Sequence, residues 1–365
     1  MGSMLSIGLM SGTSLDGIDA ALIETDGVGL VRPIAFRCEQ WSDSARAQLA
    51  EASRQALTFE RPRASPALVE AGALVDRMHI LAVRKLIAEA GVSAEQIGVI
   101  GYHGQTVAHR PERGWTWQIG DGAILAESLK ITTVSDFRSN DVAQGGQGAP
   151  LLPVYHRALV ANLPKPVAVL NLGGVGNITW IGDGDAIVAF DTGPANSLID
   201  DWVAAETGAR FDENGAMAGA GRVDEGVLAA MLDNPFFDEP PPKSLDRSDF
   251  SMQPVRGLAA ADGAATLTAF TAESVALALR LLPSFPTRIV VAGGGRHNPV
   301  LMAMLSARCG VPVEPIETLG ADGDATEAQG FAYMAVRVLA GLPISFPGTT
   351  GIAEPLPGGI VNPVG

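Results

Sequence analysis

The sequence predicts an α/β protein of two domains, each of which opens with a β-hairpin whose turn carries glycine. Apolar residues 7–10 and 20–23 flank the small-residue turn that begins at Ser11-Gly12, which is typical of strand, tight turn and strand. The pattern returns at residues 167–181, around a turn with Gly173-Gly174, as a weak internal repeat. A chain of 365 residues favours two domains, and we expect them at residues 1–140 and 141–341, with 342–365 packing back on the first.

Composition excludes several classes of protein. With 47% hydrophobic residues the chain can bury a large core, so disorder is not expected. The net charge of −15 argues against nucleic acid or an anionic membrane as a partner. Cys38 and Cys309 lie far apart without metal spacing, which fits a reducing cytoplasm. We expect no membrane span, since the most apolar run, residues 331–346, is short and carries Arg337. We expect no signal peptide, because the apolar N-terminus lacks a basic region and a cleavage site.

The first hairpin turn has the composition of a phosphate site. Gly12 and Gly17 let the backbone bend, neighbouring residues bring hydroxyl groups, and Asp16 brings a carboxylate. Small residues, exposed amides and a carboxylate suit a polyphosphate with its Mg²⁺, and we expect Asp16 to hold that metal. The alternative is an ordinary hairpin with a polar turn. The phosphate-binding residues are expected to be Gly12, Thr13, Ser14, Leu15, Asp16, Gly17, Ile18 and Asp19.

Polar residues also follow two predicted strands. His103 and Gln105 come after residues 97–101 and share one face of an extended backbone, although a histidine satisfied within a turn is an open alternative. Asp191 follows residues 186–190 and precedes a helix whose positive end favours an anion. We predict Asp191 as a catalytic base; the alternative is a residue that caps the helix.

A third glycine-rich segment lies near the carboxyl terminus. The predicted strand 288–292 runs into Gly293-Gly294-Gly295 and then a helix, an arrangement that lets a flat ring lie against the backbone. We therefore expect Gly293, Gly294 and Gly295, together with Gly173 and Gly174 of the second hairpin, to bind nucleotide. Further on, Asp324 and Glu327 have the spacing of a capping box, which is the alternative role for Glu327.

Two glycine-bearing hairpins and a glycine shelf are the layout of the two-domain actin-like ATPases, the superfold of actin, Hsp70 and sugar kinases. The nucleotide is then expected in a cleft between the domains, with a hinge at residues 145–150. No Walker A motif occurs, and no Gly-x-Gly-x-x-Gly opens a helix after the first strand, which disfavours a Rossmann dehydrogenase.

Nine short motifs in order along the chain make the sequence similar to one family, the anhydro-N-acetylmuramic acid kinases. Local departures are Leu245-Asp246-Arg247 and Ala195, where this family usually has Thr-Gly-Arg and glycine. The matching stretches begin at Gly8, His103, Gln118, Asp136, Gly145, Leu170, Phe190, Pro242 and Gly293.

The resemblance implies a double reaction of peptidoglycan recycling in the cytoplasm, carried out by a homodimer with ATP and Mg²⁺. Water opens the anhydro bridge of 1,6-anhydro-N-acetylmuramic acid, and the freed 6-oxygen takes the γ-phosphoryl group of ATP. Asp191 is then the base that activates water. An arginine can pair with the lactyl carboxylate of the sugar. The expected sugar contacts are His103, Gln105, Arg138 and Glu327.

Three other functions stay open at this point. A levoglucosan-type kinase would act on another anhydro sugar, and an ordinary hexose kinase would need no water. A non-enzymatic ATP switch of the actin or Hsp70 kind would turn over ATP without a sugar.

Overall fold

The computed structural model describes residues 2–245 and 249–365, so Asp246 and Arg247, in the segment that departs from the family pattern, lie outside the described residues. Two compact units make up the chain. Unit 1 comprises Met1–Ala161 with Ala325–Gly365, and unit 2 comprises Asn162–Asp324. These bounds differ from the predicted domains, because residues 141–161 and 325–341 lie in unit 1. Residues 145–150, predicted as a hinge, are internal to unit 1, and the chain changes unit after residues 161 and 324.

Unit 1 is built on a seven-stranded sheet with the strand order β12-β6-β4-β1-β2-β3, and β5 pairs with β4. β1, β2 and β3 form an antiparallel meander, whereas β4 runs parallel to β1 and β6 runs parallel to β4. The strands are β1 (Met4–Ser11), β2 (Gly17–Thr25), β3 (Val31–Gln40), β4 (Ile97–Arg110), β5 (Trp115–Ile119), β6 (Thr133–Ser135) and β12 (Ile360–Asn362).

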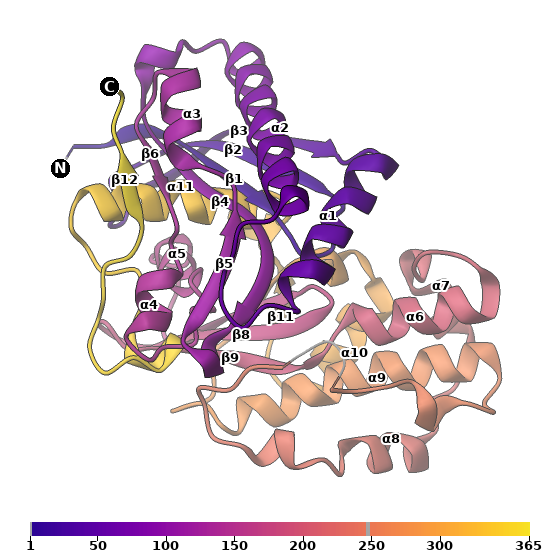
Figure 1. The fold of residues 1–365 in the computed structure, drawn as a ribbon. Helices are drawn as coiled ribbons and strands as arrows, with labels where there is room; N and C mark the ends of the chain where they lie inside the picture. Colours follow the sequence, from indigo (N-terminus) through magenta and orange to yellow (C-terminus); the bar gives the residue numbers. More distant parts are fainter. Residues whose placement is uncertain (1, 246–248) are drawn as a thin grey trace. The chain divides into compact units, whose positions relative to one another are not determined.

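Helices cover both faces of this sheet (Figure 1). Ile7 and Leu9 of β1 are buried in one cluster with Leu49 of α1 and Val83 of α2. The residue between them, Gly8, faces the other way, because side chains alternate along a strand. The helices of unit 1 are α1 (Asp43–Ala56), α2 (Pro66–Ala90), α3 (Gly122–Leu129), α4 (Ser139–Ala143), α5 (Pro153–Leu159), α11 (Thr326–Leu339) and α12 (Pro347–Thr350).

Helix α11 packs against β1, β2 and β4 although it follows them by more than two hundred residues, as its yellow-orange ribbon among the purple strands shows (Figure 1). A Cβ atom on Gly8 would lie 1.8 Å from the carbonyl oxygen of Ala328. One on Gly101 would lie 2.1 Å from the carbonyl oxygen of Phe331. Glycine at these two strand positions therefore lets the helix backbone approach the sheet, which explains why residues 325–341 belong to unit 1.

Unit 2 repeats the arrangement in a five-stranded sheet with the order β11-β10-β7-β8-β9. β7, β8 and β9 form an antiparallel meander, and β10 and β11 add in parallel on the other side of β7. Without β5 and β12, the strand order of unit 1 is β3-β2-β1-β4-β6, and that of unit 2 is β9-β8-β7-β10-β11. Counted along the chain, both orders are third, second, first, fourth and fifth. The predicted α/β fold, with a glycine-bearing hairpin opening each half, is confirmed.

One core cluster of unit 2 joins this sheet to helices α9 and α10. Leu170 of β7 and Val291 of β10 are buried with Val275 of α9 and Leu305 of α10. The strands are β7 (Val167–Leu172), β8 (Val175–Ile181), β9 (Ile187–Pro194), β10 (Ile289–Ala292) and β11 (Val313–Pro315). The helices are α6 (Asn196–Thr207), α7 (Ala216–Ala220), α8 (Glu225–Leu232), α9 (Ala260–Leu279) and α10 (Pro299–Cys309). Among the described residues, no helix has the length and apolar character needed to cross a membrane.

Candidate active site

The turn between β1 and β2 has the form that the sequence predicts. Leu15 adopts a left-handed conformation with φ 57°, and its amide donates to the carbonyl of Gly12 at 3.2 Å. Arg46 of α1 donates to the carbonyl of Leu15 at 3.1 Å, so the turn is held from outside as well. Thr13, Ser14 and Asp16 are exposed. The turn therefore presents hydroxyl groups, backbone and one carboxylate to a ligand.

Gln105 joins this turn to β4. Its amide nitrogen donates to the carbonyl of Gly12 at 3.1 Å, and Ser11 Oγ donates to the carbonyl of Gly104 at 3.3 Å. The Gln105 side-chain oxygen is buried and accepts no hydrogen bond within the part of the chain that the structure describes. Since a buried polar atom without a partner is costly, this oxygen is the free acceptor of the site.

His103 and Arg138 form a direct pair in unit 1. Arg138 Nε donates to His103 Nε2 at 3.0 Å, and Arg138 Nη1 donates to the carbonyl of Gly148 at 2.7 Å. Because His103 Nε2 accepts, Nδ1 carries the proton, and it donates to the carbonyl of Gly104 at 2.9 Å. Burial and the neighbouring guanidinium hold the pKa of His103 well below its usual range, so the ring is neutral. The Gly104 carbonyl thus fixes the histidine ring, and Nε2 of that ring orients Arg138.

The positive charge of Arg138 is not neutralised by the groups that accept its hydrogen bonds. Its two hydrogen bonds go to a neutral ring and a neutral carbonyl. Burial lowers its pKa to about 10, while Glu327 and Asp141 act in the opposite direction. At neutral pH the guanidinium is therefore cationic, and its bonds leave donor capacity for an anion.

Glu327 is the fourth predicted sugar contact, and it lies near Arg138 in the same unit. It is half-buried in the first turn of α11. Burial and the like charge of Asp19 raise its pKa, and Arg138 partly offsets this. The predicted capping box is wrong, because Ala325 is the N-cap residue and makes no side-chain cap, while Asp324 accepts from Arg296. Unit 1 thus brings all four predicted sugar contacts, together with Asp19, into one neighbourhood.

Asp191 lies in unit 2 near the end of β9. One carboxylate oxygen, Oδ2, accepts from the amide of Leu245 at 2.8 Å, and its own amide donates to the carbonyl of Lys243 at 3.0 Å. The side chain is half-buried, and burial raises its pKa to about 6 although the Leu245 amide opposes the shift. A carboxylate with this pKa is still ionised at neutral pH and is more basic than an exposed aspartate, as a general base requires.

The catalytic rate should depend on this ionisation. If Asp191 must be deprotonated, kcat/KM for the sugar, measured at saturating nucleotide, should be flat above pH 7 and fall about ten-fold per pH unit below about 6. The nucleotide KM is measured at each pH, because ATP itself titrates in this range. A profile that stays flat down to pH 4.5 would show that Asp191 does not limit the reaction.

The second hairpin turn is tied to the start of α6. The amides of Ala195 and Ser197 donate to the carbonyl of Gly174 at 3.0 and 3.2 Å, and that of Asn196 donates to the carbonyl of Gly173 at 3.0 Å. The helix amides expected to face an anion are therefore already paired with backbone carbonyls. A Cβ on Gly173 or Gly174 would make ordinary van der Waals contacts, at 3.6 and 3.7 Å, so sterics do not require glycine at these positions.

The middle residue of the triple glycine, Gly294, lines a cavity of about 570 Å³ within unit 2. Gly293 has φ 78°, and a Cβ there would lie 2.5 Å from Asn171 Oδ1, so glycine is required where β10 ends against β7. Of the five glycines predicted to bind nucleotide, Gly294 lines the cavity, whereas Gly173, Gly174, Gly293 and Gly295 are not among its lining residues. The volume of the cavity is in the range of small-molecule pockets.

One wall of this cavity was not predicted from the sequence. Phe211 lines it with an aromatic ring that is 58% exposed, and Asp212, Glu213 and Asn214 follow. Asn196, Ile199, Asp200, His297 and Asn298 complete the lining. An exposed phenylalanine before a polar turn with glycine, Asp212-Glu213-Asn214-Gly215, was the available signal.

The residues present suit a magnesium ion that arrives with a nucleotide. Within residues 2–245 and 249–365, no three His, Cys, Asp or Glu side chains gather as a metal site. Mg²⁺ commonly takes one or two carboxylates, with water and phosphate oxygens completing its shell. The exposed Asp16 in the turn between β1 and β2 fits that role.

Comparison with known proteins identifies the family. A family model described as anhydro-N-acetylmuramic acid kinase matches residues 4–363. The chain belongs to this family. A relative of that name from Rhizorhabdus wittichii is 66% identical over 363 residues, covering 99% of this chain and 100% of the relative. Another from Zymomonas mobilis is 54% identical, covering 98% and 100%.

Solved structures give more distant likenesses. Component A of (R)-2-hydroxyglutaryl-CoA dehydratase from Acidaminococcus fermentans has a TM-score of 0.49 at 13% identity, covering 92% of this chain and 99% of its own. A ROK family glucokinase from Streptomyces griseus, in complex with glucose and AMPPNP, has a TM-score of 0.42 at 14% identity, covering 91% and 99%. The family assignment depends on the sequence relatives alone.

Proposed function

We propose that this protein is an ATP-dependent kinase that opens 1,6-anhydro-N-acetylmuramic acid with water and phosphorylates the freed 6-oxygen. The oxygen of water bonds to C1 as the bond between C1 and O6 breaks. O6 then bonds to the γ-phosphorus of ATP, ADP leaves, and the product is N-acetylmuramic acid 6-phosphate. Relatives up to 66% identical over the full chain carry the name of this activity. The reaction serves peptidoglycan recycling.

The environment of Asp191 is the structural feature that best supports this proposal. The Asp191 pKa of about 6 leaves a basic carboxylate at neutral pH. The hydrogen bond from the Leu245 amide fixes the orientation of this carboxylate. This carboxylate takes the proton of the attacking water. A kinase that only transfers phosphate to an existing hydroxyl group needs no water, so the base has a distinct task here.

The nucleotide is assigned to two sets of residues. The cavity beside Gly294 takes the adenosine, with Phe211 as an aromatic face for the purine. The amides of Gly12, Thr13 and Ser14 donate to the phosphoryl group as its charge spreads. Asp16 would hold Mg²⁺, directly or through water, and the metal supplies further neutralisation of that charge.

Arg138 is assigned to the lactyl carboxylate of the sugar. It is a half-buried cation whose existing partners are neutral, so a carboxylate can complete its hydrogen bonds. This also explains how an acidic protein with a net charge of −15 accepts an acidic substrate. Gln105 Oε1 and Glu327 are the neighbouring acceptors for sugar hydroxyl or amide groups.

Replacing Arg138 with methionine should raise KM for 1,6-anhydro-N-acetylmuramic acid by about ten-fold or more, because hydrogen bonds to charged groups contribute about 1.5–3 kcal/mol. KM for the same sugar without its lactyl group should change little. Steady-state kinetics on the two substrates measures this. An equal rise for both sugars would contradict the pairing of Arg138 with the carboxylate.

The reaction itself is tested by the mass of the product. ATP and 1,6-anhydro-N-acetylmuramic acid should give a sugar heavier by one water and one phosphoryl group. Addition of a phosphoryl group without water would favour an ordinary hexose kinase. Preference for levoglucosan over the anhydromuramic sugar would favour the other anhydro-sugar kinase, and ATP turnover without any sugar would favour an ATP switch. A homodimer and a cytoplasmic location stay predictions from the family resemblance.

A further inference from the structure

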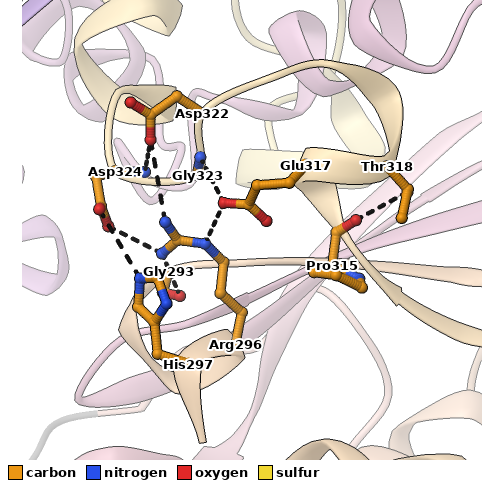
Figure 2. Close-up of polar contacts among 9 residues, drawn as sticks. All are labelled: Gly293, Arg296, His297, Pro315, Glu317, Thr318, Asp322, Gly323 and Asp324. Carbon is orange, nitrogen blue, oxygen red and sulfur yellow. Dashed lines mark hydrogen bonds and ion pairs between the residues drawn. The ribbon is translucent and has the colours of Figure 1, made fainter. Parts of the chain in front are cut away.

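Arg296 is the centre of a charged cluster next to the nucleotide cavity, but it does not line that cavity. Its side chain is only 3% exposed. Nε donates to Glu317 Oε1 at 2.7 Å, and Nη1 donates to Asp324 Oδ1 at 2.9 Å and to the carbonyl of Gly293 at 3.0 Å. A third carboxylate, Asp322, has Oδ1 4.0 Å from Nη2. Figure 2 shows the guanidinium between the three carboxylates.

The loop of residues 322–324 is shaped around this guanidinium. A Cβ on Gly323 would lie 2.4 Å from Arg296 Nε, so only glycine lets the loop backbone pass so close. The Gly323 amide donates to Glu317 Oε1 at 3.3 Å, and the Asp324 amide donates to Asp322 Oδ1 at 2.9 Å. The backbone of residues 322–324 and the three carboxylates are thus arranged around one buried cation. An accidental surface ion pair would need no such arrangement of the loop.

Arg296 also belongs to the turn that lines the cavity. Arg296 lies in η6 (Gly294–His297), the turn that follows β10, and both Gly294 and His297 line the cavity. Its bond to Gly293 fixes the left-handed residue that begins the turn. His297 Nε2 also lies 3.8 Å from Asp324 Oδ2. A ligand that restrains this turn therefore restrains the guanidinium, since Nε and Nη1 are both held by hydrogen bonds.

The other side of the cluster is where the chain leaves unit 2. Asp324 is the last residue of that unit. The segment from η7 (Ile316–Leu319) to Asp324 contributes all three carboxylates and ends directly before the helix that carries Glu327.

We propose that Arg296 is a positioning residue that couples occupancy of the nucleotide cavity to the order of residues 317–324. The adenosine contacts the turn at residues 294–297 and restrains it. Through its contacts, Arg296 then restrains the loop that carries Glu317, Asp322 and Asp324. The inference rests on the proposed function, because it takes this cavity as the nucleotide site.

Hydrogen exchange of the full-length protein with and without ADP tests the coupling. In the wild type, ADP should slow exchange at residues 293–298 and also at 317–324. In Arg296→Gln, protection at 293–298 should persist at saturating ADP, protection at 317–324 should be lost, and the Kd for ADP should rise by about ten-fold or more. Arg296→Lys keeps the charge but loses the planar fork, and should recover only part of the coupling.

The control is Arg308→Gln. Arg308 also donates to two carboxylates in unit 2, at 2.8 Å to Glu273 and 3.4 Å to Glu225, but neither lies beside the glycine turn. Its loss should leave both protected regions unchanged. If Arg296→Gln does not fold, Asp324→Ala removes the acceptor of Nη1 but keeps the arginine with Glu317 and Gly293, and it should show the same selective loss.

Two negative results have different meanings. A wild-type protein that does not bind ADP would overturn the proposed function and the coupling with it. Binding of ADP with no effect at 317–324, or an equal effect in wild type and Arg296→Gln, would overturn the coupling and leave the proposed function standing.

Discussion

Replacing Asp191 with asparagine should lower kcat by about 10²–10⁴-fold, the range that general base catalysis contributes. Asparagine keeps an oxygen that can accept from the Leu245 amide, so the β9 end and its surroundings should be unchanged. Affinities for ADP and for the sugar, measured by calorimetry, should therefore stay near the wild-type values. A variant with kcat within a few-fold of the wild type would contradict the role of Asp191 as base.

The same substitution should raise stability in a pH-dependent way. The folded pKa of about 6 lies above the ordinary value of 3.8, so ionisation of Asp191 destabilises the folded protein. The free-energy cost of ionising Asp191 in the folded protein is small below pH 3.8, grows between about pH 4 and 6, and is complete above that. This cost is at most about 3 kcal/mol before solvent screening is taken into account. Asp191→Asn should thus have a higher Tm than the wild type at pH 8 and nearly the same Tm at pH 4. Asp183→Asn, an exposed carboxylate before the same strand, is the control and should change neither Tm nor kcat.

Replacing Gly8 with alanine should destabilise unit 1 by about 3 kcal/mol or more, at the upper end of the cost of overpacking. The new methyl group would lie 1.8 Å from the carbonyl oxygen of Ala328 and 2.4 Å from the amide nitrogen of Ala332, both in the backbone of α11. Neither can move unless the whole helix shifts. The expected fall in Tm is roughly 6–12 °C by calorimetry.

Gly29→Ala is the matched control for this substitution. Gly29 has open space around its Cβ position, so alanine there should be neutral or stabilising by up to about 1 kcal/mol. If Gly8→Ala melts within 2 °C of the wild type, the close packing of α11 on β1 is not the contact that holds residues 325–341 in unit 1.

The two hairpins and Asp191 could be predicted from the sequence because their signals are local. Apolar runs around glycine turns predict hairpins at residues 7–23 and 167–181, and the structure has antiparallel pairs at both. Asp191 ends an apolar run, so its place at the end of a strand follows from a few neighbouring residues. The roles assigned to these residues stay predictions.

Other features depend on contacts between distant segments, and sequence patterns do not report them. The apolar pattern of α11 predicts a buried helix but not the sheet on which it packs, so the predicted domain bounds differ from those of the two units. Phe211 lies more than eighty residues before Gly294, and no periodicity links them. His103 was expected to contact sugar, but its two nitrogens bind Arg138 and Gly104, which only the packed structure shows.

The most direct test of the central claim, that water opens the anhydro bridge before phosphate transfer, is the position of ¹⁸O in the product. The reaction is run in ¹⁸O-water with ATP and 1,6-anhydro-N-acetylmuramic acid and is quenched early. Unlabelled N-acetylmuramic acid 6-phosphate kept in ¹⁸O-water for the same time corrects for exchange at the anomeric carbon. The expected result is one ¹⁸O atom in the hydroxyl group on C1 and none in the phosphate; label in the phosphate, or none on C1 above the exchange control, would contradict it.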